Sequence, residues 1–229
     1  MKTKEMHFIT ENIKKLTTHI PESVKIIAIS KLKPIEDIQI AYDSGHRYFG
    51  ENKTNEIKMK WEKLPKDIEW HFVGHLQTNK VKYIAPFVHL IHSVDSYRLL
   101  SEINKRAIRN DRVINCLLQL YIAEEESKHG FLLEEVKEML ESQDFANLKN
   151  IRICGVMGMA TFTENKELVR KEFQTLHTYF KEIKESYFKD CEHFKECSMG
   201  MTDDYEIALE EGSTMVRIGS AIFGERDYK

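Results

Sequence analysis

Short apolar runs alternate with amphipathic stretches along the chain. The first run, Val24 to Ser30, reads VKIIAIS and is nearly continuous and rich in β-branched residues. This composition is typical of a strand that is buried on both faces. Pro34 then opens a helical stretch at its first turn, where a missing N–H costs nothing, and Gly45 is a suitable end for that helix. A second strand is predicted at Arg47 to Gly50.

The same alternation continues to the end of the chain. Further strands are predicted at Ile68 to Gly74, Val88 to Val94, Val113 to Ile122, Ile151 to Met159, Phe194 to Met199 and Met215 to Phe223. Helical patterns lie between them, for example at Tyr97 to Ile108, Leu132 to Leu140 and Lys166 to Lys184. An additional helix, Lys4 to Thr17, precedes the first strand, and the polar segment Glu141 to Asn150 is predicted to be a loop. Every strand except the last is expected to be followed by a helix.

The regular alternation of strands and helices predicts the fold class. Strands that alternate with helices form parallel sheets. Eight such units in 229 residues favour a closed (β/α)8 barrel, the TIM barrel, over an open doubly wound sheet. No linker rich in Gly, Pro or Ser interrupts the pattern. We therefore expect an α/β protein with a single barrel domain over residues 1–229 and an extra N-terminal helix.

Charge and composition exclude several classes of function. The 34 basic and 37 acidic residues give a net charge of -3, which argues against a nucleic-acid footprint or a polybasic membrane anchor. The N-terminus has no apolar run suited to a signal sequence, and no stretch approaches the roughly 20 apolar residues of a membrane span. The 4 cysteines form no CxxC pair. We expect a cytoplasmic protein with reduced thiols that binds neither nucleic acid nor membrane.

Gly, Ser and Thr gather at the predicted carboxyl ends of the strands, where barrels carry their functional sites. The segments SMGMT, residues 198–202, and RIGS, residues 217–220, belong to strands seven and eight, the usual phosphate position in barrels. Small residues let backbone N–H groups approach a phosphate closely. Neither segment is a Walker loop or a dinucleotide motif, so phosphate binding and a purely structural role both stay open.

Lys31 directly follows the first apolar strand. Burial disfavours the ammonium form of a lysine, and a neighbouring cation such as Lys33 acts in the same direction. A neutral amine that faces a phosphate pocket suits a cofactor with an aldehyde and a phosphate. The alternative is that the Lys31 side chain extends along apolar surface into solvent.

Five motifs, in order along the chain, carry a resemblance to a known family. They are AISKLKP (residues 28–34), FGEN (49–52), WHFVGHLQTNK (70–80), GVMGMAT (155–161) and SMGMTDDYEIALEEGSTMVRIGSAIFG (198–224). With them the chain resembles, over essentially its whole length, the pyridoxal phosphate homeostasis protein family. These proteins are related to the barrel domain of fold-type III alanine racemases. The resemblance implies pyridoxal 5′-phosphate as the cofactor and a role in its storage, buffering or delivery.

The resemblance also implies a role for individual residues. Lys31 would form a Schiff base with the cofactor aldehyde. Arg217 would face the pyridine nitrogen and keep it unprotonated, which weakens the ring as an electron sink. Asn52 would border the cofactor, and the segment Lys128 to Gly130 is also family-like without an assigned role. Four residues would hold the phosphate: Ser198, Gly200, Gly219 and Ser220.

A pyridoxal-phosphate enzyme, such as an amino-acid racemase or decarboxylase, is the main alternative. A racemase needs two bases on opposite faces of the substrate carbon. In barrel racemases, as the resemblance implies, a tyrosine from a C-terminal domain of the partner subunit supplies the second base. The present chain ends at Lys229, shortly after the eighth predicted strand. We therefore expect a carrier rather than an enzyme, with no catalytic residues, and a monomer rather than a tight dimer. Apo pyridoxal-phosphate enzymes are candidate recipients.

We expect no metal site from the sequence. A phosphate-sugar enzyme on a barrel would need paired carboxylates or a metal cluster at the strand ends, and neither is evident. His71 and His75 lie on one predicted strand. Residues four apart on a strand are separated by about 13 Å, too far to share one zinc ion. Cys116 and Cys154 lie within apolar strands and are predicted to be inert core thiols.

Overall fold

The computed structural model describes residues 7–123 and 130–225. Within these ranges, parallel strands close into one barrel in the order β1 to β8. The strands are β1 (Lys25–Ile29), β2 (Tyr48–Glu51), β3 (Glu69–Phe72), β4 (Leu90–Val94), β5 (Ile114–Gln119), β6 (Ile151–Met157), β7 (Glu196–Met201) and β8 (Met215–Ile218). β1 pairs with both β2 and β8, which closes the barrel. The prediction of a TIM barrel is confirmed.

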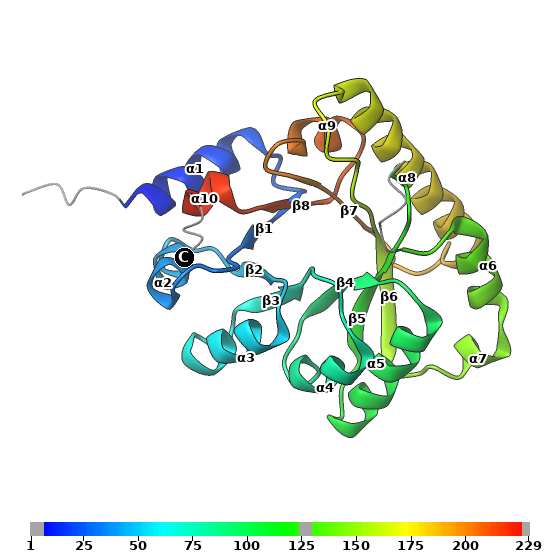
Figure 1. The fold of residues 1–229 in the computed structure, drawn as a ribbon. Coiled ribbons are helices and arrows are strands. Elements are labelled where there is room, and N and C mark those ends of the chain that lie inside the picture. The colour runs from blue at the N-terminus through cyan, green and yellow to red at the C-terminus, as the bar shows by residue number, and fades with distance from the viewer. Residues whose placement is uncertain (1–6, 124–129, 226–229) are drawn as a thin grey trace, which may run out of the picture.

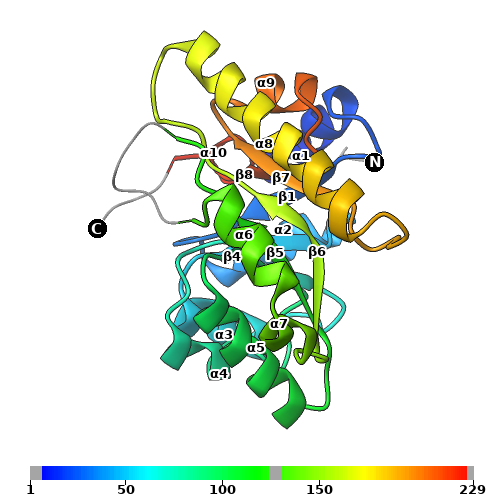
Figure 2. The ribbon, with the colours of Figure 1, turned by 90° about the vertical axis from the view of Figure 1, so that its right-hand side faces the viewer.

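Helices surround the barrel and connect its strands (Figures 1 and 2). They are α1 (Phe8–His19), α2 (Ile35–Asp43), α3 (Thr54–Lys63), α4 (Val81–Ile84), α5 (Tyr97–Arg109), α6 (Leu133–Glu141), α7 (Gln143–Ala146), α8 (Lys166–Tyr187), α9 (Tyr205–Glu210) and α10 (Ser220–Phe223), with a 3-10 turn at Thr78–Lys80. Helix α1 precedes β1, as the sequence predicts. In the described part of the chain, no helix has the length and apolar composition needed to cross a membrane.

Several predicted boundaries differ from the structure by a few residues, and the differences are most marked at three places. The eighth strand ends at Ile218, not Phe223, and Ser220–Phe223 form the helix α10. The expectation that no helix follows the last strand was therefore wrong. A helix, Gln143–Ala146, also lies within the predicted loop, and the Ser142 hydroxyl caps it by accepting a hydrogen bond from Phe145 N at 3.1 Å. The fifth strand ends at Gln119, earlier than predicted.

The alternation of side chains along each strand divides the core in two. Outward residues such as Phe49, Trp70 and Ile91 pack against the helices in the larger apolar cluster. Inward residues form a small apolar cluster that includes Ile27 and Leu117. The barrel interior also holds buried polar side chains: His71, His92, Ser198 and Arg217.

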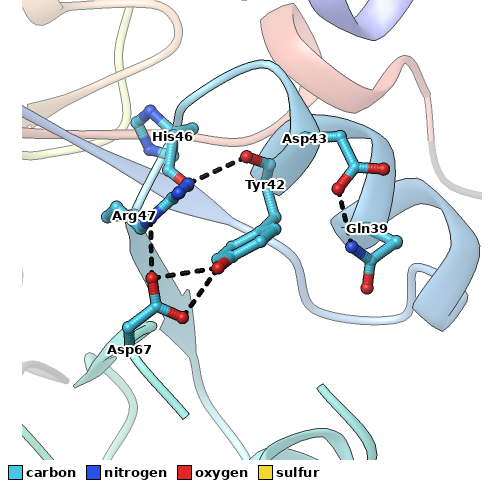
Figure 3. Close-up of polar contacts among 6 residues, drawn as sticks. All are labelled: Gln39, Tyr42, Asp43, His46, Arg47 and Asp67. Atoms are coloured by element: carbon cyan, nitrogen blue, oxygen red, sulfur yellow. Dashed lines mark hydrogen bonds and ion pairs between the residues drawn. The ribbon is translucent and has the colours of Figure 1, made fainter. Parts of the chain in front are cut away.

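A cluster of polar side chains ties α2 to the amino-terminal end of the sheet (Figure 3). The Arg47 guanidinium lies 3.8 Å from the centre of the Tyr42 ring and forms an ion pair with Asp67 at 3.0 Å. The Tyr42 hydroxyl donates to the same carboxylate at 2.8 Å. Gly45 makes the preceding turn with a positive φ of 102°. These contacts fix the entry into β2.

The segments before the first strand and after the last strand contact each other at the carboxyl-terminal end of the barrel. Asn12 of α1 donates to the carbonyl of Ile222 in α10 at 3.1 Å, and the two helices lie side by side (Figure 1). Lys33 Nζ donates to the carbonyl oxygens of Phe223 at 2.9 Å and Glu225 at 2.6 Å. Lys33 therefore joins the loop after β1 to the segment after β8.

Candidate functional site

Lys31 lies in a tight turn at the carboxyl-terminal end of β1. The next residue, Leu32, has a positive φ of 64°, which is unfavourable for a branched side chain. The Glu56 carboxylate accepts a hydrogen bond from Leu32 N at 2.7 Å, and Lys33 N donates to Ser30 O at 3.0 Å. These contacts hold the strained turn. The Lys31 side chain is half-buried.

A buried ion-pair network lies beneath this turn. Lys60 Nζ donates to Glu51 at 2.7 Å, to Glu56 at 2.6 Å and to the carbonyl of Ser30 at 2.8 Å. The Ser30 hydroxyl donates to Glu51 at 2.6 Å. Burial raises the pKa of Glu51, and the opposing effect of Lys60 is smaller. The network joins α3, β1 and β2 immediately below Lys31 and fixes the backbone from which its side chain projects.

Arg217 extends from β8 into the barrel and is only 5% exposed. Its Nη1 donates to the carbonyl and hydroxyl of Ser198 at 2.9 and 2.7 Å, and its Nη2 donates to Gly158 O at 3.0 Å. Burial lowers the pKa of Arg217 to about 10. The guanidinium stays positively charged at neutral pH and is held in one orientation by β6 and β7.

The Ser198 hydroxyl is engaged inside the barrel. Ser198 is fully buried, and its Oγ contacts Arg217 Nη1 and lies 3.0 Å from His92 Nδ1. This arrangement does not favour the phosphate contact that the sequence suggested, because both partners are interior side chains. Thr202, which was not among the residues expected at the site, is half-buried at the end of β7 and accepts a hydrogen bond from Gly219 N at 3.3 Å. The feature of the sequence that could have identified Thr202 is its hydroxyl at the end of the segment SMGMT, residues 198–202.

The other three residues assigned to the phosphate lie at the carboxyl-terminal ends of β7 and β8. Gly200 has a positive φ of 93°, and a Cβ there would lie 2.6 Å from the Cβ of Ala208 in α9. Glycine at 200 therefore allows α9 to pack closely on β7. Gly219 is buried, and Ser220 is exposed and begins α10. The first N–H groups of a helix have no partner within it and can meet an anion.

Asn52 follows β2 and is half-buried. The register pairs Ile29 with Gly50, so Asn52 reaches the same barrel end as Lys31 on the neighbouring strand. A Cβ at Gly74 would lie 2.5 Å from the carbonyl oxygen of Asn52, so the chain after β3 packs directly against it. Of the family-like segment 128–130, Lys128 and His129 lie outside the described residues, and Gly130 has a positive φ of 148°.

These groups have the chemistry that a phosphate-bearing aldehyde requires. Lys31 supplies an amine, Arg217 a fixed cation, and Thr202 and Ser220 supply hydroxyls next to glycine N–H groups. The nearby Asp204 carboxylate accepts a hydrogen bond from Met201 N at 2.5 Å. The strands β7, β8, β1 and β2 are consecutive around the barrel, so all of these residues share one sector of its carboxyl-terminal end.

Comparison with known proteins gives the family. Residues 6–227 match the family model described as alanine racemase, N-terminal domain. The pyridoxal phosphate homeostasis protein of Aquifex aeolicus is 42% identical over 205 residues, which cover 89% of this chain and 88% of the relative. The chain belongs to the pyridoxal phosphate homeostasis protein family. Another member, from Escherichia coli, is 36% identical over 216 residues, covering 91% of this chain and 88% of the relative.

Solved structures agree with this family membership. The structure of PipY from Synechococcus elongatus with PLP bound superposes with a TM-score of 0.86 at 30% identity and covers 94% of this chain and 100% of that chain. Alanine racemase from Bartonella henselae gives a TM-score of 0.69 at 13% identity and covers 96% of this chain but 59% of that chain. The latter similarity concerns the fold alone.

Proposed function

We propose that this protein binds pyridoxal 5′-phosphate and takes part in the intracellular homeostasis of that cofactor by storing, buffering or delivering it. Lys31 holds the cofactor through a Schiff base, formed when its amine condenses with the aldehyde and releases water. The placement of Lys31 carries the proposal: a rigid turn presents it next to β8, the strand that carries Arg217. Homologues named for pyridoxal phosphate homeostasis and a PLP-bound PipY support it.

The surrounding residues bind and orient the cofactor. Arg217 faces the pyridine nitrogen, and a fixed cation there disfavours protonation of the ring. Gly219 and Ser220 hold the phosphate through backbone and hydroxyl donors, Thr202 adds a hydroxyl, and Gly200 shapes the loop that carries it. We assign Ser198 to the support of Arg217. Asn52 borders the cofactor from β2.

A pyridoxal-phosphate enzyme is the second candidate, because the barrel is shared with alanine racemase. With Arg217 facing the ring nitrogen, the bound cofactor would be a weaker electron sink for carbanion chemistry than a protonated ring. A homeostasis protein should produce no more D-alanine from L-alanine than its Lys31→Ala variant does. Robust racemisation that disappears in Lys31→Ala would establish the enzyme instead.

Reduction of the loaded protein with borohydride tests the site directly. Peptide mass spectrometry should place the added mass on the peptide that contains Lys31, and the absorption band of the imine should disappear. Lys53→Ala, which removes an exposed lysine of the same barrel end, serves as the control and should label normally. Labelling of another lysine alone would refute the assignment.

Delivery is separated from storage by a transfer experiment. The loaded protein is mixed with an apo pyridoxal-phosphate enzyme, and the rate of reactivation is compared with the rate of passive cofactor release. Reactivation faster than release indicates direct delivery, whereas equal rates indicate a buffer.

Size-exclusion chromatography with light scattering tests the expected monomer.

A further inference from the structure

Two histidines and a glutamate meet at the amino-terminal end of the barrel, opposite the Lys31 site. Glu69 begins β3, and His71 lies two residues further on the same face of that strand. His89 immediately precedes β4, and its N–H donates to the Trp70 carbonyl at 2.8 Å, which places it against β3. One ligand atom from each side chain lies within 4.8 Å of the other two.

One of the two ring nitrogens of His71 is buried without a hydrogen-bond partner among the described residues. Its Nδ1 lies 2.8 Å from Nε2 of His92. Its Nε2 is buried and, among the described residues, has no hydrogen-bond partner. His71 as a whole is 1% exposed. Buried polar atoms in folded proteins are nearly always satisfied, so an unpaired nitrogen on a side chain of such a cluster points to a ligand.

We propose that Glu69, His71 and His89 bind a divalent transition-metal ion of the Zn²⁺ type. Two imidazoles and one carboxylate are a common ligand set for zinc sites that keep open positions for water. Bonds of about 2.1 Å require the ligand atoms to approach one another to about 3.5 Å. The side chains of Glu69 and His89 are 39% and 42% exposed and already 3.0 Å apart, so they can close on the buried His71.

Hydrogen bonds behind His71 support the same assignment. A metal on Nε2 requires the proton of His71 to sit on Nδ1, from which it is donated to His92 Nε2. His92 Nδ1 then donates to Ser198 Oγ at 3.0 Å. Metal-binding histidines usually have such an orienting partner on the second nitrogen. Lys25, a nearby cation, is paired with Glu196 at 2.7 Å.

This site differs from the pair considered in the sequence. His75 lies beyond the other end of β3, where its ring is 3.2 Å from the Asp95 carboxylate. His89 comes from the segment immediately before the neighbouring strand β4, and spacing along one strand cannot show that it meets His71. No metal site was expected because the carboxyl-terminal strand ends carry no ligand cluster and because His71 and His75 are too far apart along one strand.

Titration with Co²⁺ and Zn²⁺ tests the proposal on the full, untagged chain loaded with its cofactor. We expect one Co²⁺ per chain with visible absorption bands of a low-symmetry site, displacement by Zn²⁺, and no competition from Mg²⁺. Glu69→Gln and His89→Asn, both near the surface, should weaken binding by about tenfold or more. His19→Asn, which removes an exposed histidine of α1, is the matched control and should bind normally. Equal affinity in all variants, or no saturable binding, would overturn the proposal.

Two measurements do not depend on the stability of the variants. Ring nitrogen NMR should show the His71 Nε2 resonance moving on addition of Zn²⁺ while Nδ1 stays protonated. Anomalous diffraction from a zinc-soaked crystal should give a peak within bonding distance of all three side chains. A water molecule at His71 Nε2 without anomalous signal would refute the site, whatever the outcome of the Lys31 experiments.

Discussion

Arg217 Nη1 donates a hydrogen bond to Ser198 Oγ at 2.7 Å, entirely inside the barrel. The same oxygen contacts His92, which in turn contacts His71, so polar contacts run through the barrel from the amino-terminal end to the candidate cofactor site. The guanidinium of Arg217 is therefore positioned by β7 and by the end of β6, and not by solvent. A cation with fixed orientation can act on a bound ring without reorganising.

Replacing Ser198 by alanine separates support of Arg217 from phosphate binding. The variant removes an acceptor from Arg217 and a partner from His92, which should cost about 1–3 kcal/mol of stability in urea unfolding. Thr202→Ala, in contrast, should weaken cofactor retention more than Ser198→Ala while leaving stability nearly unchanged. Equilibrium dialysis of the cofactor checks the second part. A larger loss of affinity in Ser198→Ala would return the phosphate role to Ser198.

Lys60→Met should destabilise the protein in a pH-dependent manner. The variant leaves the Glu51 carboxylate buried without its cation, which costs about 3–5 kcal/mol at neutral pH. The pKa of Glu51 is already raised by burial above its ordinary value of 4.5, and loss of Lys60 raises it further. A folded-state pKa above the unfolded value means that the contribution to stability is present below the unfolded pKa and is lost as pH rises through the folded pKa.

The destabilisation by Lys60→Met should therefore be smaller at pH 5 than at pH 8, as measured by urea unfolding at both values. The double variant Glu51→Gln, Lys60→Met removes the buried charge and should recover much of the loss at pH 8. A penalty that is independent of pH would mean that the ionisation of Glu51 does not contribute.

The strand order and the Lys31 position could be predicted because they depend on local patterns. Continuous β-branched runs such as Val24 to Ser30 identify strands that are buried on both faces. The end of β8 was misplaced because the apolar residues Ala221 to Phe223 read like a continuation of the strand. In the structure they turn at Gly219 into α10 and pack beside α1, a contact between opposite ends of the chain.

The interior of the site could not be derived in the same way. His92 lies two residues after inward-facing Leu90 in β4, and such a polar residue in an apolar strand marks an interior position. Its partner Ser198 is 106 residues away, so only the closed barrel brings them together. The role of Lys60 could not be predicted from the sequence either. Lys60 belongs to the amphipathic helix α3, but its ammonium group donates to Ser30 O after β1 and to Glu51 in β2.

The cysteines should react with thiol reagents in a defined order. Burial raises the pKa of Cys197 to about 12 and that of Cys154 to about 11, and it raises the pKa of fully buried Cys116 as well. Cys191 is the one partly exposed cysteine. Native protein should therefore show one rapidly reacting thiol with Ellman's reagent, and Cys191→Ser should abolish the fast phase. A fast phase that persists in that variant would contradict the burial of the other three.

Gly155→Ala should be much more damaging than Gly45→Ala, although both glycines have positive φ values, 147° and 102°. At Gly155 an added Cβ would lie 1.8 Å from the carbonyl oxygen of Glu196, so β6 and β7 could not keep their register without moving backbone. We expect a loss above about 3 kcal/mol or failure to fold. At Gly45 no atom lies within 4 Å of the new Cβ, and only the backbone strain of about 1–2 kcal/mol remains. Urea unfolding of both variants measures the difference, and equal losses would show that conformational strain, not the close approach of β7, sets the requirement for glycine at 155.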